Sequence, residues 1–135
     1  MSYPIQEIEG IGPAYGAKLV PCGIKSTAAL LKHCGDPKGR KKIAEASGIS
    51  EHLILKWVNL ADLMRIRGIG RQYAELLEAS GVDTVKELRH RRPDNLAAKM
   101  AEVNGVKKLA RRTPVPSMIE DWIEQAAKLA PAVTY

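Results

Sequence analysis

Apolar residues recur three and four positions apart along most of the chain, whereas the alternation typical of a half-buried strand is nowhere sustained. The clearest helical stripe in the second half consists of Ile119, Trp122, Ile123, Ala126 and Leu129. Its counterpart in the first half consists of Leu53, Trp57, Ala61 and Met64. Glycines separate these stretches, and Gly23 and Gly81 stand where a helix would end. The pattern predicts an all-α fold with four to five short helices in each half.

Residue types that cap helices support these boundaries. Thr84-Val-Lys-Glu87 and Ser117-Met-Ile-Glu120 have the spacing of a capping box, in which two side chains bond backbone N–H groups at a helix start. Asp36 and Ser50 also belong to the types that accept such bonds. We therefore predict helix N-termini at these four positions.

The chain is similar to itself at a fixed offset. Residues 8–15 and 66–73 share an Ile, a Gly-Ile-Gly triplet and a Tyr at positions 58 residues apart. An insertion at 107–116 then brings the two tryptophans of the chain to matching places. We therefore predict two tandem repeats, residues 1–60 and 61–135, that pack together as one compact unit.

The composition indicates an aliphatic core and a basic surface. Hydrophobic residues make up 45% of the chain, but aromatic residues only 4%, and Phe is absent. The net charge of +6 indicates a polyanionic partner, although a modest positive excess also keeps proteins soluble. Residues 1–60 carry eight Lys and Arg with five acids, and residues 61–135 carry 13 with ten. Each half therefore has a charge of +3, and total charge does not single one out.

Several classes of protein are unlike this sequence. No stretch is long and apolar enough for a membrane span, and the N-terminus lacks the order of a signal peptide, so we expect a cytoplasmic protein without membrane contact. Cys22 and Cys34 match no common zinc or redox spacing, and we expect two reduced thiols. The end of the chain, residues 130–135, is expected to fray.

Gly10-Ile11-Gly12 and Gly68-Ile69-Gly70 occupy the same place in both copies. Glycine allows a positive φ and a close approach of a ligand to the backbone, while the central Ile can insert into the core. A helix is predicted to start directly after each triplet. Its first amides and its dipole favour an anion such as phosphate.

Residues 8–14 and 66–74 resemble the helix-hairpin-helix family, whose pattern is an apolar residue, one variable residue, Gly-apolar-Gly and a helix that carries Ala. Members bind the DNA backbone without reading sequence, through hairpin amides and nearby basic side chains. By position, the resemblance implies a nucleic-acid site made of Arg67, Gly68, Ile69, Gly70 and Arg71, and of Gly10, Gly12 and Lys18. The whole chain also resembles an uncharacterised bacterial domain-of-unknown-function family built on such hairpins.

The two hairpins differ in charge. Glu7 and Glu9 flank the first, and Pro13 stands where the second has Arg71. Arg65, Arg67 and Arg71 surround the second hairpin, so a phosphate is expected there rather than at the first. The alternative is that both triplets are only packing corners between helices.

Three further basic groups could extend a phosphate-binding surface or could be solvated faces. They are Lys38–Lys42, the group Arg89, Arg91 and Arg92, and the group Lys107, Lys108, Arg111 and Arg112. The aromatic residues of the two stripes and hairpin helices, Trp57, Trp122, Tyr15 and Tyr73, are expected to pack in the core. The three histidines, His33, His52 and His90, lack partners at catalytic or metal-binding spacing and are expected at the surface.

The sequence has no Walker loop, nucleophile elbow or dinucleotide-binding fingerprint. We therefore expect no enzymatic activity, no cofactor, no metal and no small-molecule substrate. The expected function is sequence-independent binding of nucleic acid, with duplex DNA favoured. The alternative is a protein-interaction or scaffold module.

Overall fold

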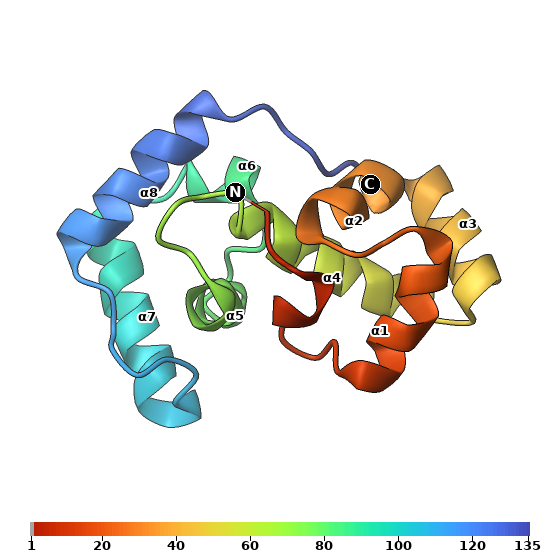
Figure 1. Cartoon of the computed structure of the whole chain (residues 1–135). Helices are drawn as coiled ribbons and strands as arrows, with labels where there is room; N and C mark the ends of the chain where they lie inside the picture. The colour runs from red at the N-terminus through yellow and green to blue at the C-terminus, as the bar shows by residue number, and fades with distance from the viewer. Residues whose placement is uncertain (1) are drawn as a thin grey trace.

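The computed structural model describes residues 2–135, and the backbone in this range is helical apart from connecting loops and one isolated bridge between Pro4 and Ser26 (Figure 1). The predicted all-α class is confirmed. The α-helices are α1 (Pro13–Leu19), α2 (Thr27–Cys34), α3 (Pro37–Ser47), α4 (Glu51–Leu63), α5 (Arg71–Ala79), α6 (Val85–Leu88), α7 (Pro93–Lys107) and α8 (Pro116–Lys128). Two short 3-10 helices, η1 (Ile5–Glu7) and η2 (Val20–Cys22), flank α1.

Helix α4 forms the middle of the molecule, with α1–α3 on one side of it and α5–α8 on the other (Figure 1). It continues across residue 60, so one unbroken helix belongs to both halves of the chain. Helices α1 and α5 each start directly after a Gly-Ile-Gly triplet. Helices α2 and α6 each start after a hydroxyl residue, Ser26 or Thr84, whose side chain caps the helix.

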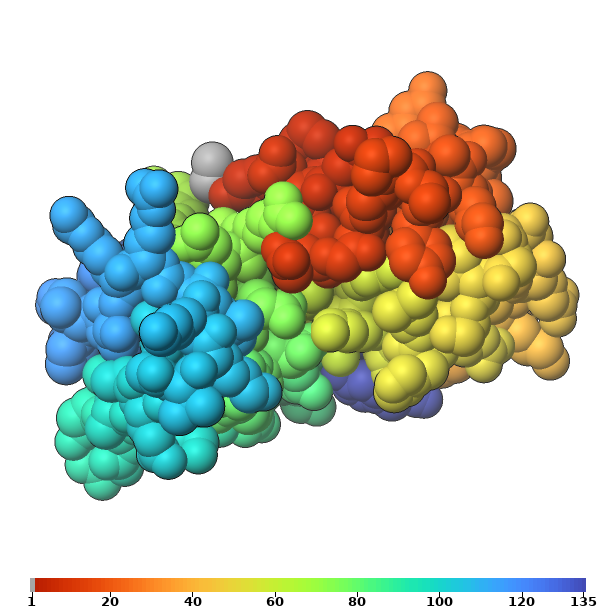
Figure 2. Space-filling model, turned by 90° about the horizontal axis from the view of Figure 1, so that it is seen from below, coloured from red at the N-terminus to blue at the C-terminus, as the bar shows by residue number. Residues whose placement is uncertain are grey.

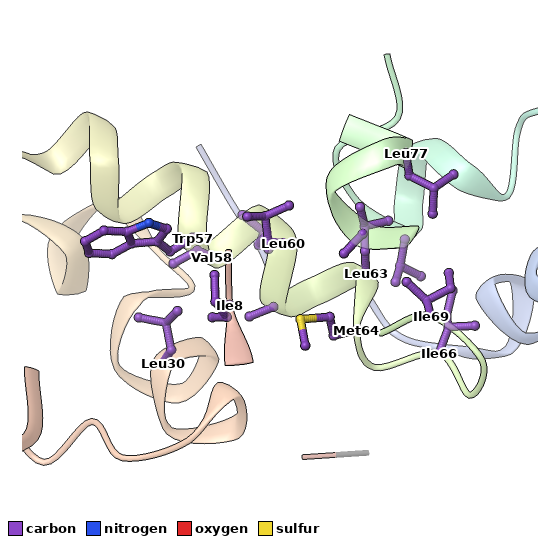
Figure 3. Packing of buried hydrophobic residues seen from close by; sticks show 14 of the residues in the cluster. Ile8, Leu30, Trp57, Val58, Leu60, Leu63, Met64, Ile66, Ile69 and Leu77 are labelled. Atoms are coloured by element: carbon purple, nitrogen blue, oxygen red, sulfur yellow. The ribbon is translucent and has the colours of Figure 1, made fainter. Parts of the chain in front are cut away.

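The hydrophobic core follows α4 from one half into the other. Figure 3 shows Trp57 and Val58 near Ile8 and Leu30, and further along α4 shows Leu63 beside the loop and helix that follow. These side chains belong to a single cluster of buried residues that includes members of both halves. Burial of this aliphatic surface is the main force that joins the halves.

Each tryptophan packs against the tyrosine of its own hairpin helix. The ring centroids of Tyr15 and Trp57 lie 5.0 Å apart, and those of Tyr73 and Trp122 lie 5.2 Å apart. Both tryptophans are almost completely buried, and both tyrosines are half-buried. The expectation that these four aromatic residues pack in the core is confirmed.

Three of the four predicted helix caps are confirmed. Asp36, Ser50 and Thr84 each accept a hydrogen bond from the backbone N–H three residues later. The capping box at Ser117 was wrong, because α8 begins at Pro116, with Val115 at the N-cap and no side-chain cap. Proline has the φ of a first helical residue, so the helix starts before Ser117, which lies inside the first turn.

The expectation that the chain frays after residue 129 was also wrong. The Thr134 N–H donates to the Gly35 carbonyl over 2.8 Å, and Val133 is 8% exposed. Figure 1 shows this segment crossing from α8 to the neighbourhood of α2. The segment stays ordered because its backbone finds partners at the α2–α3 corner and because Val133 joins the core.

Arg40 on α3 holds the same segment in place. Its guanidinium donates to the carbonyls of Cys34, Gly35 and Thr134, at 3.1, 3.1 and 2.7 Å. Arg40 is only 6% exposed. It therefore belongs neither to a phosphate-binding surface nor to a solvated face, the two interpretations that its basic group suggested.

The two cysteines are free thiols in different surroundings, which predicts different reactivity. Cys34 is fully buried, and burial raises the pKa of its thiol to about 11. Cys22 is half-buried, and its thiol donates to the Lys18 carbonyl. Since the thiolate is the reactive form, we expect iodoacetamide at neutral pH to modify Cys22 in the folded protein, and Cys34 only after unfolding. Mass spectrometry of the labelled peptides checks this, and equally fast labelling of Cys34 in a Cys22→Ser variant would contradict it.

Within residues 2–135, no helix combines the length and the apolar character needed to cross a membrane.

Candidate nucleic-acid interface

The two Gly-Ile-Gly hairpins have closely similar backbones. The first glycine has a φ of +93° in Gly10 and +97° in Gly68, a region that favours glycine. The central residues Ile11 and Ile69 are buried, as expected, and each donates its N–H to the carbonyl three residues earlier. A Cβ on Gly68 would also lie 3.0 Å from the indole Nε1 of Trp122. The positive φ therefore favours glycine at position 68, and the indole leaves little room for a Cβ there.

The helix that follows each hairpin begins without a side-chain cap, because its N-cap is Gly12 or Gly70. The first N–H groups of a helix have no acceptor within the helix. At α1 one of these donors is missing, since Pro13 is its first residue. At α5 the first residue is Arg71, which adds a positive charge to the same end. The second hairpin therefore offers one more backbone donor and one more positive charge at its helix start than the first.

The second hairpin forms one wall of an open hollow of about 580 Å³. The hollow is lined by Gly68, Gly70, Arg71, Gln72, Tyr73, Arg111 and Arg112. The last two residues come from the loop between α7 and α8, which is tied to α5 because the Arg111 N–H donates to Gln72 Oε1 over 3.2 Å. Three arginines therefore line the same hollow as the two glycines of this hairpin. The sequence had suggested the group at 107–112 only as a separate basic cluster.

Arg65, Arg67 and Arg71, which lie near the second hairpin in the sequence, make different contacts in the structure. Arg71 lines the hollow, whereas Arg65 bonds the buried carboxylate of Asp62 over 2.8 Å. The other Asp62 oxygen accepts the Val85 N–H at the start of α6, so this pair helps to hold α6 onto α4. Arg67 is exposed, and Gln125 of α8 bonds both its N–H and its carbonyl, over 2.9 and 3.1 Å. No local pattern in the sequence points to Gln125, because its partner lies 58 residues away.

An ion pair connects the two hairpins. Arg71 Nε donates to Glu9 Oε2 at 2.5 Å, and about half of each side chain remains exposed. This hydrogen bond is the largest of the influences that raise the Arg71 pKa above its ordinary value. Figure 2 shows the red N-terminal segment against the green segment after α4, with the α7–α8 loop beside them in blue. The acidic first hairpin therefore borders the basic hollow.

A second, smaller hollow of about 470 Å³ adjoins the first and shares Arg71 and Gln72 with it. Its other lining residues are Glu9, Glu75, Lys108 and Leu109. One carboxylate oxygen of Glu75 is buried there, with no hydrogen-bond partner among the residues described. The lining of this hollow contains both acidic and basic side chains, in contrast to the lining of the first, whose charged residues are all arginines.

The remaining predicted site residues are not brought to the basic hollow. Lys18 lies over the Tyr15 ring, with its Nζ 5.9 Å from the ring centroid. Arg91 pairs with Glu87 and lies close to Gly81, beyond the C-terminal end of α5. Helix α5 has nine residues and is about 13 Å long, and the hollow lies at its other end.

Of the same group, Arg92 lies 3.7 Å from the Asp94 carboxylate, and Arg89 is half-buried next to α6. His33, His52 and His90 are exposed, as expected. Across residues 2–135, the structure shows no cluster of three or more His, Cys, Asp and Glu side chains that could hold a metal ion.

Comparison with known proteins identifies a family for this arrangement of helices. The family model described as Domain of unknown function (DUF4332) matches residues 9–129, which include both hairpins and α8. No curated protein and no solved structure matches the chain significantly. The match spans most of the 135 residues, and the chain therefore belongs to the DUF4332 family.

Proposed function

We propose that this protein is a duplicated helix-hairpin-helix module that binds the backbone of nucleic acid without sequence preference, with duplex DNA as the favoured ligand. The observation that supports this most directly is the basic hollow, which Arg71, Arg111 and Arg112 line together with Gly68 and Gly70. The proposed activity is binding alone, without catalysis.

A backbone phosphate is proposed to lie against the second hairpin. The uncapped N-terminus of α5 offers amide donors and the positive end of its dipole, and the two glycines leave the backbone open to approach. The Arg71 guanidinium stands at the same helix end and adds charge-assisted hydrogen bonds. Gln125 fixes the hairpin backbone at Arg67, which prepares this geometry before the ligand arrives.

The α7–α8 loop is proposed to contact neighbouring phosphates. Arg111 and Arg112 are exposed and line the same hollow as the hairpin, and Gln72 keeps the loop close to α5. Lys108 lines the adjoining hollow and extends the basic surface. Amides and guanidinium groups that contact phosphate fix position without reading bases, which is why we propose binding without sequence preference.

A protein-interaction or scaffold role is the second candidate. It is favoured by the Glu9–Arg71 ion pair, which already occupies one cation of the hollow. It is also favoured by the burial of Ile11 and Ile69, since a packing corner needs nothing more.

A salt series separates the two candidates. We expect the wild type to bind a short DNA duplex, with log K falling steeply as log salt concentration rises. The Arg111→Gln/Arg112→Gln variant should bind more weakly, and its slope should be shallower by about two units, since each lost phosphate contact removes roughly 0.9. Fluorescence anisotropy with a labelled duplex measures both quantities.

The matched control is Lys38→Gln/Lys41→Gln, which removes the same charge from exposed positions of α3, at the far end of the molecule from the α7–α8 loop (Figure 1). Its slope should stay close to that of the wild type. Equal losses in the two variants would indicate attraction by total charge rather than by this hollow. Absence of binding by the wild type at low salt would favour the scaffold role.

A further inference from the structure

We propose that Glu9 competes with backbone phosphate for Arg71, and so lowers the affinity of the second hairpin for phosphate. This inference rests on the function proposed above. It assigns a role in that function to the acidic first hairpin, which otherwise has none.

The geometry places Glu9 on one of the N–H donors that Arg71 would offer to a phosphate. Its carboxylate accepts a hydrogen bond from Arg71 Nε, and Arg71 is the one basic side chain that lines both hollows. About half of each side chain is exposed, so the pair can open without disturbing the core. Glu9 and Arg71 are 62 residues apart in the chain, and the packing of the two halves around α4 brings them together.

The chemistry makes carboxylate and phosphate alternatives for the same donors. A guanidinium presents a planar fork of N–H donors that matches two oxygens of either group. While Nε bonds Glu9, a phosphate at the hairpin has access only to the remaining N–H groups of Arg71. A ligand phosphate must therefore displace Glu9 or accept a weaker contact, and it also meets the negative charge of Glu9 at close range.

The cost of displacing Glu9 is the same for a single phosphate and for linked phosphates, but the total binding that remains is different. An exposed ion pair changes an equilibrium constant by about fivefold at most. A nucleic-acid strand that also contacts Arg111 and Arg112 gains from several phosphates at once, and this gain exceeds the cost of displacing Glu9. Glu9 therefore lowers the affinity for every anion by a similar factor, so that a single anion, which binds weakly, stays mostly unbound while a polyanion stays bound.

Glu7 provides a matched control for the charge of Glu9. It lies two residues earlier, is exposed, and influences Arg71 through its charge without a hydrogen bond. Glu7→Gln and Glu9→Gln both remove one negative charge from the first hairpin. Only the second also releases the Arg71 guanidinium.

The test is a double-mutant cycle with a labelled DNA duplex and, separately, inorganic phosphate as probes. We expect Glu9→Gln to tighten duplex binding about three- to fivefold, the value of an exposed ion pair, and Glu7→Gln by less than about twofold. In an Arg71→Gln background, Glu9→Gln should give no more gain than Glu7→Gln. Inorganic phosphate should perturb the Arg71 Nε–H resonance in Glu9→Gln at concentrations that leave the wild type unchanged.

The outcomes distinguish this inference from the function on which it rests. If the wild type binds the duplex but Glu9→Gln and Glu7→Gln have equal effects, the competition is overturned and nucleic-acid binding stands. If no protein binds the duplex at low salt, both are overturned, and the failure lies in the proposed function. If Glu9→Gln does not shift the Arg71 Nε–H resonance of the free protein, the ion pair itself is absent in solution and the inference is overturned.

Discussion

Replacing Trp57 by alanine is expected to lower the free energy of unfolding by about 3–5 kcal/mol, the usual cost of removing a buried Trp. Trp57 on α4 is 1% exposed and packs edge-on against Tyr15. It belongs to the core cluster that the two halves share. The cavity would open next to the Gly10 backbone, because the position of a Cβ on Gly10 lies 3.5 Å from Trp57 Nε1. Urea denaturation with linear extrapolation measures the loss.

Val106→Ala is the control for this substitution. Val106 is 81% exposed near the end of α7, so the loss of its methyl groups should change stability by less than about 0.5 kcal/mol. A cost for Trp57→Ala similar to that of Val106→Ala would show that the tryptophan is not packed as described.

Replacing Arg40 by methionine is expected to cost about 3 kcal/mol and to release the end of the chain. The guanidinium donates to three backbone carbonyls in a nearly buried position, and methionine keeps the length of the side chain but none of the donors. Hydrogen bonds from charged groups contribute about 1.5–3 kcal/mol each, and part of the loss is recovered when water reaches the freed carbonyls. Chemical denaturation measures the first effect, and amide hydrogen exchange at Thr134 measures the second.

Lys41→Met is the matched control, because Lys41 is the next residue of α3 and is exposed. It removes the same charge with little expected change in stability. If Arg40→Met leaves the Thr134 amide as protected as Lys41→Met does, Arg40 does not hold the C-terminal segment.

Local signals in the sequence predicted the helices well. Periodicity gave the all-α class, and the caps at Asp36, Ser50 and Thr84 depend only on residues three positions away. The error at Ser117 has the same local origin, since two start signals stand side by side and Pro116 decides between them. The backbone of the Gly-Ile-Gly hairpins was also predictable, because a positive φ and a buried central Ile are properties of the triplet itself.

The composition of the candidate site depended on contacts across the fold. The sequence indicated Gly68, Gly70 and Arg71, but the contact that brings Arg111 to them joins residues 39 positions apart. Arg65 and Arg67 looked equivalent in the sequence, and only tertiary structure shows that Arg65 bonds the buried Asp62. Arg40 was misjudged for the same reason, because its Thr134 partner is 94 residues away and nothing in a basic run identifies the buried member.

The return of the C-terminal segment to the α2–α3 corner has a consequence for the order of events during synthesis. Domains usually fold as they leave the ribosome, N-terminal part first, and a tandem repeat invites folding one copy at a time. Before residues 133 and 134 are synthesised, the Arg40 guanidinium lacks the Thr134 carbonyl as an acceptor. The core also lacks Val133, the residue with which the C-terminal segment covers it. The first half can therefore complete its native packing only after residue 134 has been translated, although most of its own residues emerged long before.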